Sequence, residues 1–328
     1  MSTPPGRSLR SRHGGDPEKP VSTVQFGTRG SALARTQSGH VADAFRAATG
    51  REVELVEVRT DGDRSTAPLA SMGGTGVFVS ALRDALRAGE VDVIVHSFKD
   101  LPTAPADGIV IAAVPERADA RDALATRDGV TLAKLPHGAR VGTGSPRRRA
   151  QLLAARPDLD VVGIRGNVDT RLGRLYDADD DRRVDGLVLA AAGLERLGRI
   201  GEAAELLDID RWPTAPAQGA LALEIRADAS PALRERIGAV DHTATHRAAT
   251  AERGVLARLE AGCSAPIAAH AAVADGTITL TAAVFAADGT SELTIVETGH
   301  DPLELADRVA VALLERGAAA LAPLGGVR

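Results

Sequence analysis

Residues 91–103 read VDVIVHSFKDLPT, a nearly unbroken apolar run that ends in charged residues. A strand without alternating polar residues is typical of a sheet that is buried on both faces. Further Val- and Ile-rich runs of this kind alternate with helical patterns. The strands predicted in this way are Val24–Gly27, Glu52–Val58, Val91–Ser97, Ile109–Val114, Ala139–Gly142, Val161–Ile164 and Asp185–Ala192. The alternation predicts an α/β fold with mostly parallel sheets covered by helices.

Helices are predicted between these strands, and glycine stop signals such as Gly50 and Gly89 follow two of them. Their ranges are 31–49, 77–88, 146–155 and 168–176. Proline-containing stretches indicate linkers at Pro115–Arg121, Trp212–Pro216 and Ala229–Pro231. These linkers divide the chain into several compact parts.

The C-terminal part has a different pattern, in which a helix at 244–259 precedes three successive strands. Asp-Gly pairs at 275–276 and 288–289 are hairpin-turn signals between the strands. The strands are Ile267–Val273, Thr277–Ala286 and Leu293–Thr298, and a final helix occupies 302–321. This order predicts a separate α+β domain.

Composition excludes several classes of protein. The chain has 328 residues with a net charge of −5, and no apolar run approaches the roughly 18 residues that a membrane helix needs. Aromatic residues make up 2% of the chain, which disfavours nucleic-acid binding by base stacking. One cysteine, Cys263, leaves no intramolecular disulfide. Because residues 1–20 carry charges and no apolar core, we expect a disordered extension and a cytoplasmic protein.

Two arginine-rich turns follow predicted strands and open predicted helices. Residues 141–149 read VGTGSPRRR and residues 165–172 read RGNVDTRL. Ligands of open α/β sheets bind at the carboxyl ends of strands, where helix N-termini favour anions. Several dispersed guanidinium groups suit several carboxylates better than one phosphate. The alternative is a pair of solvated basic turns.

The charged end of the opening stretch is a third candidate. Lys99 is one of three lysines in a chain that otherwise uses arginine, and Asp100 follows it directly. A carboxylate beside a cation stays ionised and can stabilise a developing cation or relay a proton. An ordinary Lys–Asp turn pair is the alternative, and His96 is interpreted as a structural histidine.

Three further sites are weaker. Residues 27–37, GTRGSALARTQ, place Arg29 and Ser31 at a glycine turn, where Ser31 also suits a helix N-cap. Cys263 lies in a Gly-Cys-Ser turn, which favours a modified thiol, although a buried inert thiol is the default for a single cysteine. His242 and His246 have helical spacing but no evident third ligand, so no metal site is predicted.

Taken together, eight motifs resemble the hydroxymethylbilane synthase (porphobilinogen deaminase) family in order over residues 24–328. They are GTRGSALARTQ, TGVF, VHSFKDLPT, VGTGSPRRR, RGNVDTRL, LAAAGLERLG, PAQGALALE and LEAGCSAPI. The resemblance implies two hinge-linked α/β lobes like those of bilobed binding proteins, plus a C-terminal α+β domain. The implied limits are 21–116 plus 214–236, 117–213 and 237–328.

The resemblance also implies the reaction. Four porphobilinogen molecules are joined head to tail with release of ammonia, on a dipyrromethane cofactor held by a thioether to Cys263. Asp100 would be the central catalytic group, assisted by Lys99 and Arg29. Cofactor-binding residues would be Cys263, Lys99, Asp100, Ser145, Arg147, Arg148 and Arg171, and substrate-binding residues Arg29, Ser31, Arg165, Arg171, Arg196, Phe78 and Gln218.

Some positions depart from the family pattern. Ser71 and Thr75 stand where relatives often carry lysine, and Arg149 is an additional basic residue. The resemblance implies a monomer without nucleic-acid or membrane partners, whose product can pass to a uroporphyrinogen-III synthase. The alternative function is a non-catalytic bilobed protein that binds a small polycarboxylate.

Overall fold

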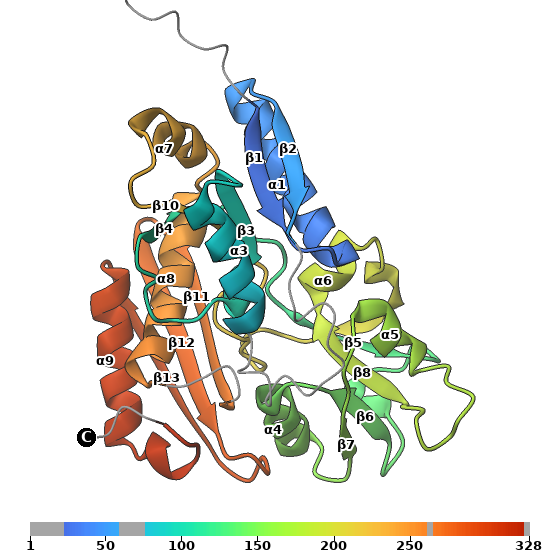
Figure 1. Cartoon of the computed structure of the whole chain (residues 1–328). Coiled ribbons are helices and arrows are strands. Elements are labelled where there is room, and N and C mark those ends of the chain that lie inside the picture. The colour runs from blue at the N-terminus through green and yellow to red at the C-terminus, as the bar shows by residue number, and fades with distance from the viewer. Residues whose placement is uncertain (1–22, 59–75, 261–264, 325–328) are drawn as a thin grey trace, which may run out of the picture.

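The computed structural model describes residues 23–58, 76–260 and 265–324, and its elements form three sheets (Figure 1). The first sheet has the order β2-β1-β3-β10-β4. Its strands are β1 Val24–Thr28, β2 Val53–Glu57, β3 Val93–Ser97, β4 Ile109–Ala113 and β10 Leu221–Arg226. Its helices are α1 Ala32–Thr49, α3 Gly76–Ala88 and α7 Pro231–Gly238.

The second sheet repeats this plan with the order β7-β6-β8-β5-β9. Its strands are β5 Asp122–Thr126, β6 Arg140–Thr143, β7 Asp160–Gly163, β8 Gly186–Ala190 and β9 Ala203–Leu206. The helices are α4 Pro146–Ala155, α5 Val168–Gly173 and α6 Ala191–Arg196. Short 3₁₀ turns are η2 Phe98–Asp100, η3 Leu132–Lys134 and η4 Ile200–Glu202.

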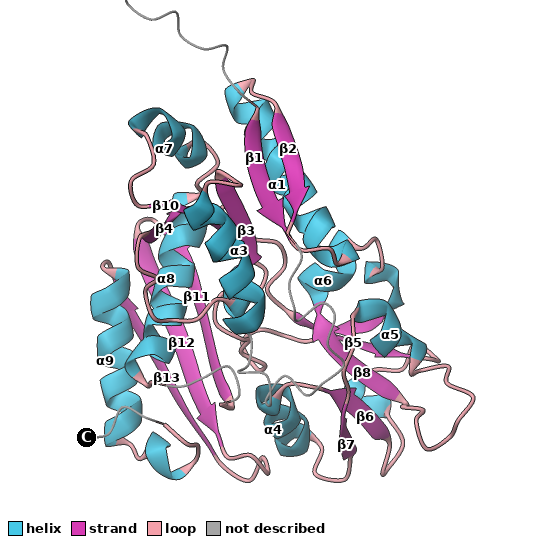
Figure 2. Cartoon of the chain, in the orientation of Figure 1, coloured by secondary structure: helices cyan, strands magenta, loops and turns pink. Residues whose placement is uncertain are grey.

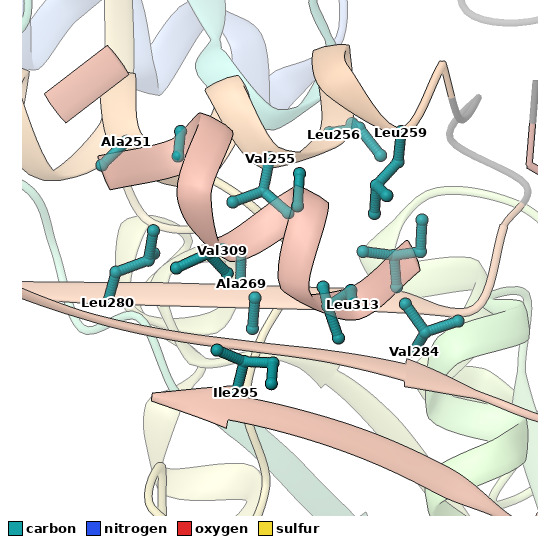
Figure 3. Close-up of a cluster of buried hydrophobic side chains, with 14 of the residues drawn as sticks. Ala251, Val255, Leu256, Leu259, Ala269, Leu280, Val284, Ile295, Val309 and Leu313 are labelled. Carbon is teal, nitrogen blue, oxygen red and sulfur yellow. The ribbon is translucent and has the colours of Figure 1, made fainter. Parts of the chain in front are cut away.

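The third sheet is an antiparallel meander of β11 Ile267–Ala274, β12 Thr277–Phe285 and β13 Glu292–Gly299. Helices α8 Thr243–Arg258 and α9 Pro302–Glu315 pack on the sheet, and a 3₁₀ turn η5 Ala318–Ala320 follows (Figure 2). Figure 3 shows Val255 and Val309 of these helices facing Leu280 and Ile295 of the sheet. Burial of such aliphatic side chains, at roughly 1.5–3 kcal/mol each, drives this domain to form its own core.

The predicted α/β fold with a C-terminal α+β domain is confirmed, but the sheets are mixed rather than mostly parallel. In the first sheet β10 is antiparallel to β3 and β4, and in the second β5 is antiparallel to β8 and β9. Strands β5, β9 and β10 and helices α6 and α7 were absent from the sequence prediction. Charged residues inside β9 and β10, Glu205 and Glu224, mask the apolar pattern. The predicted domain limits stay a prediction; each sheet takes its strands from within one of those ranges.

Two segments cross between the first and second sheets, and they are bonded to each other. One runs from β4 to β5 and the other from β9 to β10. The Ala118 amide donates to the Gly219 carbonyl at 3.2 Å. Gly219 has φ +85°, and a Cβ there would lie 2.5 Å from the Ala118 oxygen, so the crossing requires glycine.

The third domain contacts both other sheets. Ala249 of α8 packs in a buried cluster with Phe98 and Leu101, which flank the η2 turn. On the opposite face of the small sheet, Phe285 of β12 packs against Ala150 of α4. The C-terminal domain therefore touches the η2 turn and the helix α4 that follows the first arginine-rich turn.

Candidate active site

The turns after β3 and β6 bring their charged side chains to one place between the two sheets. Lys99 Nζ donates to Gln218 Oε1 at 3.3 Å, and Arg148 Nη2 donates to the same oxygen at 3.2 Å. Gln218 is fully buried in the segment that leads back to the first sheet. This amide therefore joins side chains of both sheets to the crossing segment.

Below this contact lies a buried carboxylate that sequence analysis missed. Asp122, at the start of β5, has no exposed surface. Four donors surround it: Arg147 Nη2 at 2.8 Å, Arg148 Nη2 at 2.7 Å, Gln218 Nε2 at 2.8 Å and Trp212 Nε1 at 3.0 Å. Burial raises the pKa of Asp122, but the attraction of Arg147 and Arg148 outweighs burial and holds this pKa well below its usual range. Asp122 is thus a permanent anion that orients two arginines.

Both arginines donate three side-chain hydrogen bonds within the protein, but apart from Asp122 their partners differ. Arg147 is 3% exposed and donates to Gln151 Oε1 at 2.6 Å and to the Pro213 carbonyl at 3.0 Å, besides Asp122. Arg148 is 6% exposed and also donates to the Val188 carbonyl at 3.2 Å. Because Arg148 shares the Gln218 Oε1 acceptor with Lys99, Arg148 is the arginine that is linked to the charged turn.

Lys99 is a desolvated cation. Burial lowers its pKa to about 8, Asp100 opposes that change, and Arg148 adds to it. Arg171 of α5 is likewise desolvated, and nearby Arg148 further lowers its pKa while Asp100 raises it. Its Nε donates to the Gly166 carbonyl at 2.7 Å. The Asp100 carboxylate is exposed at the end of η2. Lys99 and Arg171 thus both attract one accessible carboxylate, Asp100, and Arg148 lies near both cations, an arrangement that favours anionic ligands.

Helix N-termini border this group of charges. Ser145 caps α4 and accepts from the Arg148 amide at 3.4 Å, and Pro146 occupies the first helical position as expected. Ser31 caps α1 in the same way, accepting from the Ala34 amide at 3.3 Å. Both serines therefore have the N-cap role, which leaves each hydroxyl hydrogen as a donor.

The remaining arginines are placed less centrally. Arg29 is partly buried between β1 and α1, and Arg165 is exposed after β7, where the described residues offer it no ion-pair or hydrogen-bond partner. Arg149 is exposed and donates to the Val161 carbonyl. Arg196 donates to the Gly219 carbonyl at 2.6 Å, and burial lowers its pKa to about 10. It lines a groove of about 720 Å³ with α1 and the first crossing segment, which does not include Lys99 or Asp100.

Some predicted residues cannot be placed. Cys263, Ser71 and Thr75 lie outside the described residues. Phe78 belongs to α3, and the structure describes its backbone but not its side chain.

Each of the three histidines named in the sequence analysis lies beside a polar side chain. His96 is buried with its Nε2 3.3 Å from Glu224 Oε2, which supports the structural reading. His242 and His246 each bond within their own turn, to Thr245 and Asp241. Within the ranges that the structure describes, no three His, Cys, Asp or Glu side chains gather as a metal site. No helix in these ranges is long and apolar enough to span the membrane.

Sequence reasoning missed a second set of residues, which ties the crossing segments to the C-terminal domain. Glu252 of α8 is fully buried and accepts from Arg117 Nη1 at 2.7 Å and from the Ala217 amide at 2.5 Å. Arg117 also donates to the Gln218 carbonyl at 2.5 Å. A lone acid inside an otherwise small-residue helix was the available signal, because buried carboxylates need partners.

Comparisons with known proteins agree with this arrangement. Residues 24–234 match the family described as porphobilinogen deaminase, dipyromethane cofactor binding domain, and residues 246–315 match its C-terminal domain. The porphobilinogen deaminase of Leifsonia xyli is 51% identical, over 96% of this chain and 98% of its own length. That of Thermobifida fusca is 54% identical, over 84% of this chain and 85% of its own length.

Solved structures give a more distant likeness. A periplasmic substrate-binding protein from Coxiella burnetii covers 70% of this chain and 97% of its own at 14% identity, with a TM-score of 0.40. The methionine-binding protein MetQ covers 70% of this chain and 94% of its own at 12% identity, with a TM-score of 0.41. Such low scores carry no weight for function, whereas the sequence matches disfavour a non-catalytic polycarboxylate-binding protein.

The matched domains span nearly all of the described chain, and the relatives share about half of its residues over most of their length. The chain belongs to the porphobilinogen deaminase family of transferases, whose N-terminal domains bind a dipyrromethane cofactor.

Proposed function

We propose that the chain condenses four porphobilinogen molecules into hydroxymethylbilane at the Lys99–Asp100 turn. The observation that carries this proposal is the accessible Asp100 carboxylate among the desolvated cations Lys99, Arg148 and Arg171. Porphobilinogen carries one acetate and one propionate, so a growing chain accumulates carboxylates. A cleft with several guanidinium groups matches that charge.

Lys99, Arg148 and Arg171 hold carboxylates in this proposal. Lys99 and Arg171 already carry part of the cost of leaving water, so a carboxylate that approaches them restores the lost charge stabilisation. Ser31 and Ser145 donate their hydroxyl hydrogens, and Arg29, Arg165 and Arg196 bind further substrate carboxylates beyond the central group.

Gln218 and Arg147 support this arrangement. Arg147 bonds Asp122, Gln151 and Pro213 but not the Gln218 amide that joins Arg148 to Lys99, so its contribution to the cofactor passes through Asp122 and the orientation of Arg148. Gln218 contributes through its bonds to Lys99 and Arg148. In this proposal, substrate selectivity depends on the positions of Lys99 and Arg148 as well as on their charges.

Asp100 carries the chemistry. Its carboxylate would hold the proton that passes to the departing amine, and in its ionised form it would stabilise the cation left on the substrate. Carbon–nitrogen bond cleavage releases ammonia, and carbon–carbon bond formation follows with loss of a proton from the accepting ring.

The residues present fit a dipyrromethane. The charged donors around Asp100 match a group with four carboxylates, and α8 leads from the packed third domain toward residues 261–264. Attached through the Cys263 sulfur, the cofactor would supply the free pyrrole carbon to which new units are added.

We also propose that the enzyme works as a cytoplasmic monomer without a nucleic-acid partner and passes its product to a uroporphyrinogen-III synthase. A net charge of −5 supports the absence of nucleic-acid binding. Size-exclusion chromatography with light scattering tests the monomer, and added synthase should raise the yield of cyclised product if hand-over occurs.

Intact mass spectrometry tests the central proposal. Purified protein should carry a mass excess of two linked pyrrole units on the peptide that contains Cys263, and Cys263→Ala should lack it. An unmodified protein that gains two units from porphobilinogen would be the apo-enzyme. A protein that gains no mass and releases no ammonia would contradict the proposal.

A further inference from the structure

One guanidinium group from the C-terminal domain holds the backbone on both sides of the Lys99–Asp100 pair. Arg253 Nη1 donates to the carbonyls of Phe98 and Leu101, each at 2.9 Å. Its Nη2 donates to the Pro102 carbonyl at 2.7 Å. The Arg253 Cζ lies 4.5 Å from the centre of the Phe98 ring. The side chain of Arg253 is thereby fixed in three directions.

The η2 turn depends on outside partners for its shape. A three-residue 3₁₀ turn makes few bonds of its own, and the bond that closes η2 runs from the Leu101 amide to the Phe98 carbonyl. Leu101 donates back to Phe98 at a long 3.3 Å. The planar guanidinium fork provides hydrogens where the carbonyls before and after Lys99 and Asp100 need them.

The helix that carries Arg253 is itself rigidly seated. Ala248, Ala251 and Val255 of α8 lie in the core of the third domain. Ala249, one turn before Arg253, packs instead in the cluster that contains Phe98 and Leu101. One face of α8 therefore belongs to the third domain, and the adjacent face supports the charged turn of the first sheet.

The same helix ends immediately before the segment that contains Cys263. Arg253 precedes Cys263 by ten residues, and α8 ends at Arg258. A single helix thus connects the support of the Lys99–Asp100 turn to the segment in which the proposed function attaches the cofactor.

We propose that Arg253 is a positioning residue, which sets the place of Asp100 relative to the cofactor by binding the carbonyls of Phe98, Leu101 and Pro102. This inference rests on the proposed function for its catalytic consequence. Arg253 does not touch substrate in this scheme; it acts through the backbone of the turn. A displacement of about 1 Å in a catalytic group costs on the order of 100-fold in rate.

The test compares Arg253→Met and Arg253→Lys with Arg258→Met. Arg258 lies on the same helix, is half exposed and pairs with Asp307 at 2.6 Å, away from the turn. Methionine keeps the apolar stem of Arg253 over Phe98 but donates nothing to the carbonyls. Lysine keeps the charge but lacks the fork, so it should restore part of the function.

Two readouts are needed. Amide hydrogen exchange in residues 97–103 should rise at least tenfold in Arg253→Met and not in Arg258→Met. The kcat for porphobilinogen should fall about 10- to 100-fold in Arg253→Met. Its KM should change less than threefold, the cofactor mass should be retained, and Arg253→Lys should have an intermediate kcat.

The results separate three cases. Unchanged exchange and kcat in Arg253→Met overturn the positioning role. Loss of cofactor or of global fold in proportion to kcat, in both Arg253 variants, also overturns it and assigns Arg253 to stability. If wild-type protein does not consume porphobilinogen, the proposed function fails, while the exchange experiment still decides whether Arg253 holds the turn.

Discussion

Gln218 donates from its side-chain Nε2 to Asp122 Oδ1 at 2.8 Å, although 96 residues separate the two in sequence. Gln218 lies on the segment that crosses from β9 to β10, and Asp122 is the first residue of β5, where the other crossing segment ends. Through Gln218 Oε1, the same contact reaches Lys99 and Arg148. The crossing segments and the charged cleft therefore form one hydrogen-bonded unit. A substitution in one of them should alter the geometry of the other.

Replacement of Asp122 by Asn should strongly destabilise the protein. The change leaves two almost fully buried guanidinium groups, of Arg147 and Arg148, without their shared anion. Removing one partner of such a buried pair costs about 3–5 kcal/mol. Urea unfolding should detect this loss. Asp307→Asn, which breaks the exposed pair with Arg258, should cost about 0–1 kcal/mol. Equal stability of the two variants would contradict the assignment.

Replacement of Asp100 by Asn should leave a folded protein that retains its cofactor but has very little turnover. General acid–base groups contribute about 100- to 10,000-fold, and kcat should fall within that range. Asp100→Glu keeps a carboxylate and should retain more activity. Asp107→Asn changes an exposed aspartate outside the cleft and serves as the control. Ammonia release by Asp100→Asn at a near-normal rate would exclude the proposed catalytic role.

Carboxylate binding should weaken as pH rises through about 8. Burial lowers the Lys99 pKa to that value, so the ammonium is charged below pH 8 and neutral above it. The KM for porphobilinogen, measured between pH 6 and 9.5, should therefore rise on the alkaline side. The arginine in Lys99→Arg stays charged, so the alkaline rise in KM should move to higher pH. Lys134→Arg, at an exposed site, should not move it. An identical rise in Lys99→Arg would assign it to another group.

Glu224 should contribute stability that disappears in acid. Burial by itself would raise its pKa, but the interactions with His96 and Arg83 outweigh burial. The pKa of Glu224 is therefore lowered from an ordinary 4.5 to about 2. Because the folded-state pKa is depressed, the contribution is present above pH 4.5 and is lost as pH falls toward 2. Two to three pKa units correspond to about 3 kcal/mol.

Urea unfolding of wild type and Glu224→Gln at pH 7 and pH 3 measures this contribution. The difference in unfolding free energy between the two proteins should shrink at pH 3. Glu292→Gln, at the exposed start of β13, should show little difference at either pH. A Glu224→Gln effect that is constant with pH would indicate packing rather than charge.

Local sequence patterns predicted much of the fold because they act over one element and its turn. The apolar run that ends in Lys99 and Asp100 formed β3 and η2, and Ser145-Pro146 began α4 as expected. The two Asp-Gly pairs separated the three antiparallel strands of the last domain. The final helix ended at Glu315 rather than 321, since Gly317 adopts φ +92°.

Strand order and pairing were decided by contacts between distant segments. β10 lies between β3 and β4, where its buried Glu224 meets Arg83 and His96, and no local pattern reveals such partners. A charged residue inside an apolar run argues against a buried strand, unless the residue that pairs with it is known.

The sequence by itself determined which charged residues follow strands and open helices, because those features depend on neighbours within a few positions. The tertiary structure decided what each charge does. It placed Asp122 under Arg147 and Arg148, left Asp100 exposed beside desolvated Lys99, and set Arg253 behind the turn. Burial and pairing with distant residues decide the charge state of a side chain and which groups it contacts. Both depend on segments far apart in the sequence, so no single segment encodes them.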